Sequence, residues 1–566
     1  MILLEIEKRL SGIIAWGLLI VTLLVTDRIS ADPVNVGKML AIATVAGFCL
    51  AILISLRKEI YKHFKLAVLL LSGFVCISFV SILLSSNPWE KGFYGTYARN
   101  TGFLTYLSLA ILFLSASQLL RNESYLRIIR AFLLAGLFNL FYCFFVLGGI
   151  DIFTWQNPYG KVLGTFGNPN FISSFMAIFL ITLFTILISP DVKVGIRALL
   201  GLPIIGSLFV IKATGSQQGL VVAAGGIAIV LFFFIRAKFG NQVVSGVYSL
   251  SVAAVGITSI LGMLQVGPLA GLLYKDSVSY RGEYWQAGIN MALANPLFGV
   301  GLDSYGTFYR SFREQSATVV PGINVVTDSA HNVFIDILSS TGFVGLFLYL
   351  ALIFLVMFEC VRYIKKSRGF DPIFVILFST WIAYLAQSLI SINQIGLAIW
   401  GWVLSGLLLG YTRKVNIGIL EIKLSKVSDL LRTKKKIQTK ELSAGVTLGI
   451  IVGGVAFFIL AVPSFYADAS LRNAVKNNSI DEYVKVANQF PIDSNRLNFI
   501  ASRITIDGIN EQSVTLVRMG LEKFPFDYGL LNSQYLISGQ DSEEGKAIGR
   551  RLNLADPFNP DYVKFK

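Results

Sequence analysis

The sequence predicts an all-α protein: a polytopic membrane helical bundle with a long extracytoplasmic loop and a C-terminal helical-repeat domain. The first observation is composition, because 54% of the 566 residues are hydrophobic and 14% are charged, whereas soluble domains carry about 25% charged residues. The second is that apolar runs of about 20 residues, long enough to cross a bilayer as helices, recur along the chain. The third is that Lys and Arg gather in alternate loops. A lone soluble domain is excluded.

The apolar runs predict 12 to 13 membrane-spanning helices. The first run follows the leader MILLEIEKR, which carries two Glu, and no small-x-small cleavage site follows it. We therefore interpret it as a retained helix rather than a signal peptide. The thirteen candidates lie near 10–26, 37–56, 66–85, 101–120, 129–150, 170–189, 195–213, 218–235, 243–265, 332–359, 373–391, 394–411 and 443–463.

The distribution of basic residues predicts the topology. If the N-terminus is cytoplasmic, the inner segments hold 26 Lys and Arg and the outer loops hold 10, which satisfies the positive-inside rule. The net charge of +15 then belongs to topology and indicates no nucleic-acid partner. The four cysteines are scattered in apolar runs, so a disulfide scaffold is excluded. We expect a multi-pass protein of the plasma (inner) membrane, with the long loop and the C-terminal tail extracytoplasmic.

Four regions follow from this map. Residues 1–265 hold membrane helices 1 to 9, and residues 266–331 form the extracytoplasmic loop with a candidate active site. Residues 332–464 hold helices 10 to 13 and a basic cytoplasmic loop at 412–442. Residues 465–566 form a polar, helical tail outside the membrane.

The tail contains a weak internal repeat. The run QFPID at 489–493 recurs as KFPFD at 523–527. The spacing of 34 residues is also seen between matching Phe and Asp residues, namely Phe490, Phe524 and Phe558, and Asp493, Asp527 and Asp561. This period is typical of tetratricopeptide (TPR) helical hairpins, so we predict a TPR-like tail that offers a docking surface for a protein partner.

His331 is the first candidate catalytic residue. It ends the long loop in the run TDSAHNVFIDIL, where the tenth span begins and where Asp328 or Ser329 can cap the helix. A neutral imidazole at this position can accept a proton from a hydroxyl group near pH 7. The alternative is a helix-end histidine that only bonds a neighbouring carbonyl group.

Two arginines in the predicted outer loops are candidate anion-binding residues. Arg281 lies among Tyr280, Tyr284 and Trp285 in an amphipathic stretch suited to a membrane surface, and Arg99 precedes the fourth span. A guanidinium group binds phosphate in a bidentate manner without a metal ion. The alternative is that both side chains extend to lipid phosphates. No H-E-x-x-H, zinc-spaced Cys set or Walker sequence occurs, so we predict no metal site and no cofactor.

Several motifs resemble those of the O-antigen ligase and O-antigen polymerase superfamily. They are R-G-E-Y-W, N-P-L-F-G-V-G-L-D-S-Y and A-H-N-V-F-I-D-I-L with T-G-F-V-G, together with G-T-Y-A-R-N-T-G-F-L-T-Y-L, G-x-x-G-N-P-N and Q-I-G-L-A-I-W-G-W. The resemblance covers about residues 80–410. It implies a metal-independent membrane glycosyltransferase that moves a glycan from a polyprenyl-pyrophosphate carrier to a hydroxyl acceptor, which is a lipid, a polysaccharide or a protein.

The resemblance also implies roles for particular residues. His331 is similar to the loop-end histidine that activates the acceptor hydroxyl, and Arg281 to the loop arginine that holds the pyrophosphate. Many members have Arg in a T-x-S-R turn near the eighth span, whereas TGSQQG here has Gln217. Lys212 or Arg99 is the expected replacement for that phosphate contact. The predicted substrate-binding set is Arg281, Arg99, Lys212, Tyr280, Trp285 and Asn332.

Two other functions remain open at this point. Outward arginines are also compatible with a transporter of a small anion such as bicarbonate, although the predicted spans hold almost no acidic residues for ion coupling, Asp336 being the main exception. A non-catalytic assembly protein with a degenerate site is the third possibility, and Gln217, in place of the family's arginine, is the residue that would indicate it.

Overall fold

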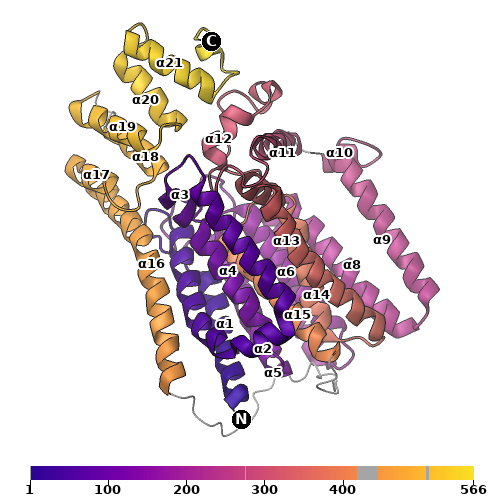
Figure 1. The fold of residues 1–566 in the computed structure, drawn as a ribbon. Coiled ribbons are helices and arrows are strands. Elements are labelled where there is room, and N and C mark those ends of the chain that lie inside the picture. Colours follow the sequence, from indigo (N-terminus) through magenta and orange to yellow (C-terminus); the bar gives the residue numbers. More distant parts are fainter. Residues whose placement is uncertain (1, 275, 417–443, 505–508, 566) are drawn as a thin grey trace.

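The computed structural model describes residues 2–274, 276–416, 444–504 and 509–565. Within these ranges the chain is helical and contains no strand, so the predicted all-α class is confirmed. Figure 1 shows a helical bundle with the N-terminus at one end and the C-terminal tail at the other. The predicted basic loop at 412–442 lies largely outside the described residues.

The bundle is built from twelve of the described helices, and all thirteen predicted runs fall on them. Nine are long and apolar enough to cross a membrane; α4 and α14 are shorter, and α1 carries charges near its start. Their bounds are α1 Ile2–Leu23, α2 Asn35–Leu83, α4 Phe103–Ala116, α5 Asn122–Leu147, α6 Pro169–Ile188, α7 Val194–Ala213, α8 Gln217–Phe239, α9 Gln242–Met263, α13 Val333–Lys366, α14 Pro372–Ser388, α15 Ile395–Asn416 and α16 Ala444–Asn477.

Two predicted spans, 37–56 and 66–85, are joined in the single helix α2. Its 49 residues would measure about 74 Å if straight, more than twice the hydrocarbon thickness of a bilayer. The backbone leaves helical geometry at Phe64, where φ is −129° and ψ is 26°. The arm before Phe64 packs through Gly47 against Gly453 of α16, and the arm after it packs through Gly73 against α13. The bend therefore turns one helix into two bundle members.

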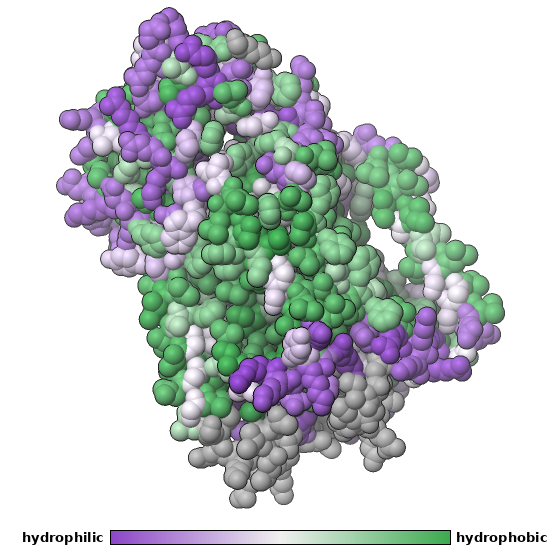
Figure 2. Space-filling model, viewed as in Figure 1, coloured by the Kyte–Doolittle hydropathy of each residue, from purple (hydrophilic) through white to green (hydrophobic). Residues whose placement is uncertain are grey.

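The surface agrees with a membrane-embedded bundle. Figure 2 shows a continuous apolar surface across the bundle, bounded by hydrophilic residues on the tail and at the opposite end. Exposed large apolar side chains such as Phe347, Phe354 and Phe358 of α13 contribute to this surface. Exposed apolar area of this extent is unfavourable in water and favourable in lipid.

Short helices of the long loop and the neighbouring loops cover the end of the bundle that faces the tail (Figure 1). The aromatic helix predicted for the membrane surface is α11, and it packs against α13 and α12 with Tyr284 buried in a small aromatic core. The elements at this end are α3 Trp89–Tyr94, η1 Gly164–Phe166, α10 Ala270–Leu273, α11 Asp276–Ala294, α12 Tyr305–Phe312 and η2 Gln315–Thr318.

The tail is helical, and α16 runs from the bundle into it (Figure 1). The 34-residue repeat is only partly visible in three dimensions. Asp493 and Asp527 each accept a hydrogen bond from a backbone N–H at the start of a helix, whereas Asp561 lies inside one. The TPR-like assignment stays a prediction. The tail helices are α17 Ile480–Ala487, α18 Ser494–Ile504, α19 Glu511–Lys523, α20 Tyr528–Ser538, α21 Glu543–Ala555 and α22 Pro560–Val563.

Candidate active site

The candidate site is built around the start of α13, where His331 precedes the helix. Asn332 is the N-cap, because its side-chain oxygen accepts hydrogen bonds from the N–H groups of Phe334 and Ile335. The prediction that Asp328 or Ser329 caps this helix is therefore wrong; all three residue types cap helices, and Asn332 is the one adjacent to the first turn. The predicted substrate-binding role of Asn332 is thus accompanied by a structural one.

His331 has a left-handed backbone with φ of 54°, a conformation that costs a non-glycine residue about 1 kcal/mol. Its N–H donates to the Ser329 hydroxyl group at 3.0 Å. Its ring Nδ1 lies 3.3 Å from the Ser329 carbonyl oxygen. A carbonyl group only accepts, so Nδ1 carries the proton in this contact. In the neutral ring, Nε2 then keeps its lone pair and can act as a base.

The surroundings favour the neutral form of His331. Burial lowers its pKa below the ordinary value of 6.5, the Ser329 carbonyl group opposes this, and the positive charges of Arg99 and Arg281 lower the pKa further. The Tyr284 ring lies 5.7 Å away, centroid to centroid. Two nearby cations and partial burial therefore favour the neutral imidazole over the protonated one.

Arg99 forms a bidentate ion pair with Asp328. Its Nε and Nη2 donate to the two carboxylate oxygens at 2.7 and 2.6 Å. Burial lowers the pKa of Arg99, but the charge and hydrogen bonds of Asp328, together with the charges of Asp303 and Asp336, outweigh it and the net change is upward. Burial likewise raises the pKa of Asp328, and Arg99 brings it below the ordinary value. Asp328 is three residues from His331, so the pair joins the 95–102 loop to the segment that carries His331.

Asp303 is a site residue that the sequence analysis did not select. Its carboxylate accepts hydrogen bonds from the N–H groups of Thr96 and Thr101 at 2.8 and 3.2 Å. Burial raises its pKa to about 6, and the nearby charge of Asp328 acts in the same direction. The signal for Asp303 lay in G-L-D-S-Y, where a lone acid follows glycines, but its partners are more than 200 residues away in sequence.

A cavity of about 60 Å³ lies beside these residues. It collects polar side chains from α4, the long loop, α13 and the segment before α15. His331 and Arg281 are not among its lining residues. The polar and charged ones include Asn35, Arg99, Thr101, Tyr106, Asp303, Tyr305, Asp328, Ser329, Asp336, Ser340, Asn393 and Gln394.

Arg281 lies on α11, and its positive charge lowers the pKa of His331. Burial lowers its pKa below the ordinary value of 12.5. No described carboxylate forms an ion pair with it, in contrast to Arg99. Tyr280 and Trp285 on the same helix pack, partly buried, against the aromatic core of the long loop. Arg281 is thus a partly buried cation whose charge reaches His331.

Lys212 is not joined to this group by any hydrogen bond or ion pair among the described residues. It is exposed in the last turn of α7, after which Gln217 begins α8. The adjacent Gln218 is buried and donates to the Ser174 hydroxyl group at 2.8 Å. The turn with the two glutamines therefore contributes a hydrogen bond inside the bundle, from Gln218 to Ser174. Lys212 has no described hydrogen bond or ion pair with a residue of the candidate site.

The glycine-rich motif N-P-L-F-G-V-G packs its backbone against a break in α13. Gly342 has φ of 69° and ψ of −173°, which interrupts the helix. The N–H of Phe343 donates to the Pro296 carbonyl group at 2.8 Å, and the N–H of Val300 to that of Ser339 at 2.8 Å. A Cβ atom on Gly299 would lie 2.4 Å from the Ser339 oxygen. Glycine is needed because two backbones meet here.

The predicted G-N-P-N turn is present and starts α6. Gly167 has φ of 69°, Asn168 is the N-cap and accepts from the N–H of Asn170, and Pro169 occupies the first helical turn. Proline fits there because that N–H has no partner in the helix. The motif is explained by local backbone geometry.

Part of the chain is similar to a known protein family. Residues 202–350 match the family model described as O-Antigen ligase. The match runs from α7 through the long loop into α13 and contains Arg281 and His331, while Arg99 precedes it. No curated protein gives a significant match. With the nine apolar helices of the described chain, the match supports a multi-pass membrane protein that is similar to O-antigen ligases over residues 202–350, and in general a ligase or glycosyltransferase.

Proposed function

We propose that the protein is a membrane glycosyltransferase of the O-antigen ligase type, transferring a glycan from a polyprenyl-pyrophosphate carrier to a hydroxyl acceptor on the outer side of the plasma membrane. One observation carries the proposal. His331 is a partly buried imidazole whose Nδ1 lies 3.3 Å from the Ser329 carbonyl oxygen, and its pKa is lowered by the charge of Arg281, a cation without a described carboxylate partner.

The proposed chemistry is an inverting displacement without a metal ion. His331 Nε2 accepts the proton of the acceptor hydroxyl as its oxygen bonds to the anomeric carbon. The bond from that carbon to the pyrophosphate oxygen breaks, and the pyrophosphate departs with the electron pair. Arg281 stabilises the negative charge that develops on this leaving group.

Arg99 has a second role in the proposal. Asp328 occupies its Nε and Nη2, so the guanidinium group keeps Nη1 for a phosphate oxygen. Its main effect is to fix Asp328 beside His331. Tyr280, Trp285 and Asn332 complete the proposed substrate-binding surface. Lys212 contributes only if the donor extends towards the end of α7.

The topology belongs to the same proposal. The N-terminus and the basic loop at 412–442 face the cytoplasm, and the 266–331 loop and the tail lie outside. The donor then reaches Arg281 from the membrane side, and the acceptor, a lipid, polysaccharide or protein hydroxyl, enters from the outer aqueous phase. The clustering of Arg99, Arg281 and His331 at the end of the bundle that carries the tail supports this arrangement.

The test is glycan transfer by the full-length protein in proteoliposomes, with a polyprenyl-pyrophosphate-linked glycan as donor. His331→Ala should lower the rate by about 100-fold or more, the usual contribution of a general base. His63→Ala is the matched control. This is the other histidine of the chain, it lies at the bend of α2 beside Glu59, and its loss should leave the rate unchanged. Transfer at the wild-type rate by His331→Ala would refute the base assignment.

A further inference from the structure

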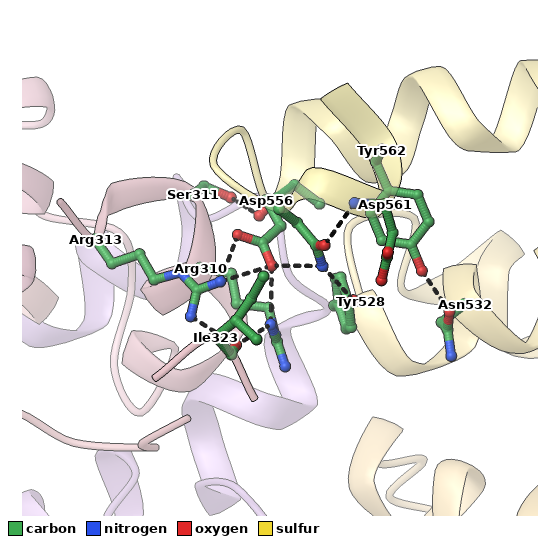
Figure 3. Close-up of polar contacts among 11 residues, drawn as sticks. Arg310, Ser311, Arg313, Ile323, Tyr528, Asn532, Asp556, Asp561 and Tyr562 are labelled. Atoms are coloured by element: carbon green, nitrogen blue, oxygen red, sulfur yellow. Dashed lines mark hydrogen bonds and ion pairs between the residues drawn. The ribbon is translucent and has the colours of Figure 1, made fainter. Parts of the chain in front are cut away.

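The tail contacts the long loop through α12, and Figure 3 shows the polar contacts between the two. Asp556, directly after α21, has a fully buried side chain and accepts two hydrogen bonds from Arg313 Nη2 at 2.8 and 2.9 Å. Arg310 Nη1 donates to the same carboxylate at 2.8 Å. The Ser311 hydroxyl group adds a bond to the Ala555 carbonyl oxygen at 3.0 Å. One carboxylate of the tail thus holds two guanidinium groups of the loop.

The same arginines bind a third segment. Arg310 and Arg313 both donate to the Ile323 carbonyl group, at 3.2 and 2.9 Å. The Arg310 guanidinium group also lies 4.0 Å from the centroid of the Tyr528 ring, a cation–π contact with the start of α20. We call this contact the tail seam; it is formed by Arg310, Arg313, Tyr528 and Asp556. The tail seam therefore fixes both α12 and the loop segment around Ile323 that follows it.

The other end of α12 contacts the candidate site. The Tyr305 hydroxyl group donates to the Tyr284 carbonyl oxygen at 2.5 Å, and the Tyr284 ring faces His331. Gly306 lies so close to Asp328 that an added Cβ atom would be 3.0 Å from its Cα. This helix of eight residues touches the site at its first turn and the tail at its last.

The tail also contacts the loop that carries Arg99. Asp493 accepts a hydrogen bond from the Tyr97 N–H at 3.2 Å, and the Tyr97 side chain packs against the tail core. Lys523 forms an ion pair with Glu90 of α3 at 3.2 Å. The tail therefore contacts both partners of the Arg99–Asp328 ion pair indirectly, one through Tyr97 and the other through α12.

We propose that the tail is a structural brace of the active site, and that Asp556 is a positioning residue that holds Asp328 and His331 through α12. A carboxylate buried with two arginines and two loop segments fixes geometry rather than offering a surface to a partner. The expected loss of glycan transfer on loosening the seam rests on the proposed function. The expected loosening of the 305–331 segment does not depend on it.

The experiment uses the full-length protein with Asp556→Asn, a change that keeps shape and removes charge. Arg313 then becomes a buried cation without a counter-charge, so the seam should loosen. Hydrogen–deuterium exchange should increase in peptides from 305–331, which contain α12, Asp328 and His331. In glycan transfer, kcat should fall by about 100-fold, as for a misplacement of about 1 Å, while the KM for the donor stays within about threefold.

Two variants separate positioning from general damage. Asp561→Asn is the matched control, because Asp561 is an exposed residue of α22 that makes no described ion pair and lies on the far side of Asp556 from both arginines (Figure 3). It should change neither exchange nor kcat. Asp556→Glu restores the charge and should recover much of both. If Asp556→Asn does not fold, Arg310→Gln removes the less buried half of the seam and should give a smaller change in the same direction.

The outcomes are distinguishable from failure of the proposed function. A folded Asp556→Asn protein with wild-type exchange at 305–331 would overturn the brace, and so would increased exchange with unchanged kcat. If instead His331→Ala transfers glycan normally, the base assignment fails while the exchange result still stands. Capture of a protein partner by the tail, with activity retained after its deletion, would establish a docking domain and contradict the proposal.

Discussion

At the scale of residues, the charge state of His331 is set by its neighbours. Burial, Arg99 and Arg281 depress its pKa, so the proposed base loses its proton below pH 6.5. Since the neutral form is the active one, we expect the transfer rate to rise with pH up to a midpoint below 6.5 and to be flat above it. The measurement is the initial rate in proteoliposomes between about pH 5 and 8.

Charge variants should move this midpoint in opposite directions. Arg281→Gln removes a cation that lowers the pKa of His331, so the midpoint should rise. Asp328→Asn removes an anion that raises the pKa, so the midpoint should fall. The rates are measured at saturating donor, so that weaker donor binding by Arg281→Gln does not alter the pH midpoint. A common direction for both variants would contradict the assignment of the titration to His331.

Sequence patterns select individual candidate residues and do not report their pairing. His331 was selected because one of only two histidines occurs at a helix start, and Arg281 because it lies in an aromatic stretch. The Arg99–Asp328 pair joins residues 229 apart, and no local pattern reports such a contact. The cap of α13 was misassigned because Asp328, Ser329 and Asn332 have similar preferences, and only backbone geometry distinguishes them.

At the scale of elements, the break in α13 gives a sharp prediction. Gly342→Ala places a side chain at positive φ, where its Cβ atom would lie 2.5 Å from the carbonyl carbon of Leu297. We expect the protein to lose about 2 kcal/mol or more of stability, measured as a lower melting temperature in detergent. Gly225→Ala in α8, with no atom within 4 Å of an added Cβ, is the control and should melt at the wild-type temperature or above. Equal melting of both variants would refute the requirement for glycine.

Hydropathy predicted helix positions well but not helix continuity. The runs at 37–56 and 66–85 were expected as separate spans, and α2 contains both. The linking residues R-K-E-I-Y-K-H-F-K contain no Gly or Pro, so nothing local ends the helix. The bend at Phe64 depends on the packing of its arms on different neighbours, which is a tertiary effect.

At the scale of the whole molecule, the topology can be tested with single cysteines. Cys49, Cys76, Cys143 and Cys360 are first replaced. In right-side-out vesicles, Asp541→Cys in the tail should react with a membrane-impermeant maleimide, and Lys62→Cys at the bend of α2 should react only after lysis. Both positions are exposed, so reactivity reports sidedness. Reaction of both before lysis would show that the two ends of the bundle were assigned wrongly.

The overall all-α, polytopic class could be predicted because apolar length and charge are additive along a chain. The attachment of the tail could not, since the repeat spacing of Asp493, Asp527 and Asp561 indicates helices and says nothing about their partners. Arg313 and Asp556 carry no distinguishing pattern in the sequence. Their contact arises only when the loop and the tail are folded against each other.

That contact has a consequence for how the protein is made. Arg313 and Asp556 are separated by 243 residues, and a ribosome needs roughly ten to fifty seconds to add that length of chain at usual rates. During this interval Arg310 of α12 and Arg313, the residue after it, have no counter-charge from the tail and must remain hydrated. The contacts of Arg310 and Arg313 with the tail therefore form only after Asp556 has been synthesised. Chains that stop before Asp556 lack the tail seam, so the loop and the tail are joined late in synthesis.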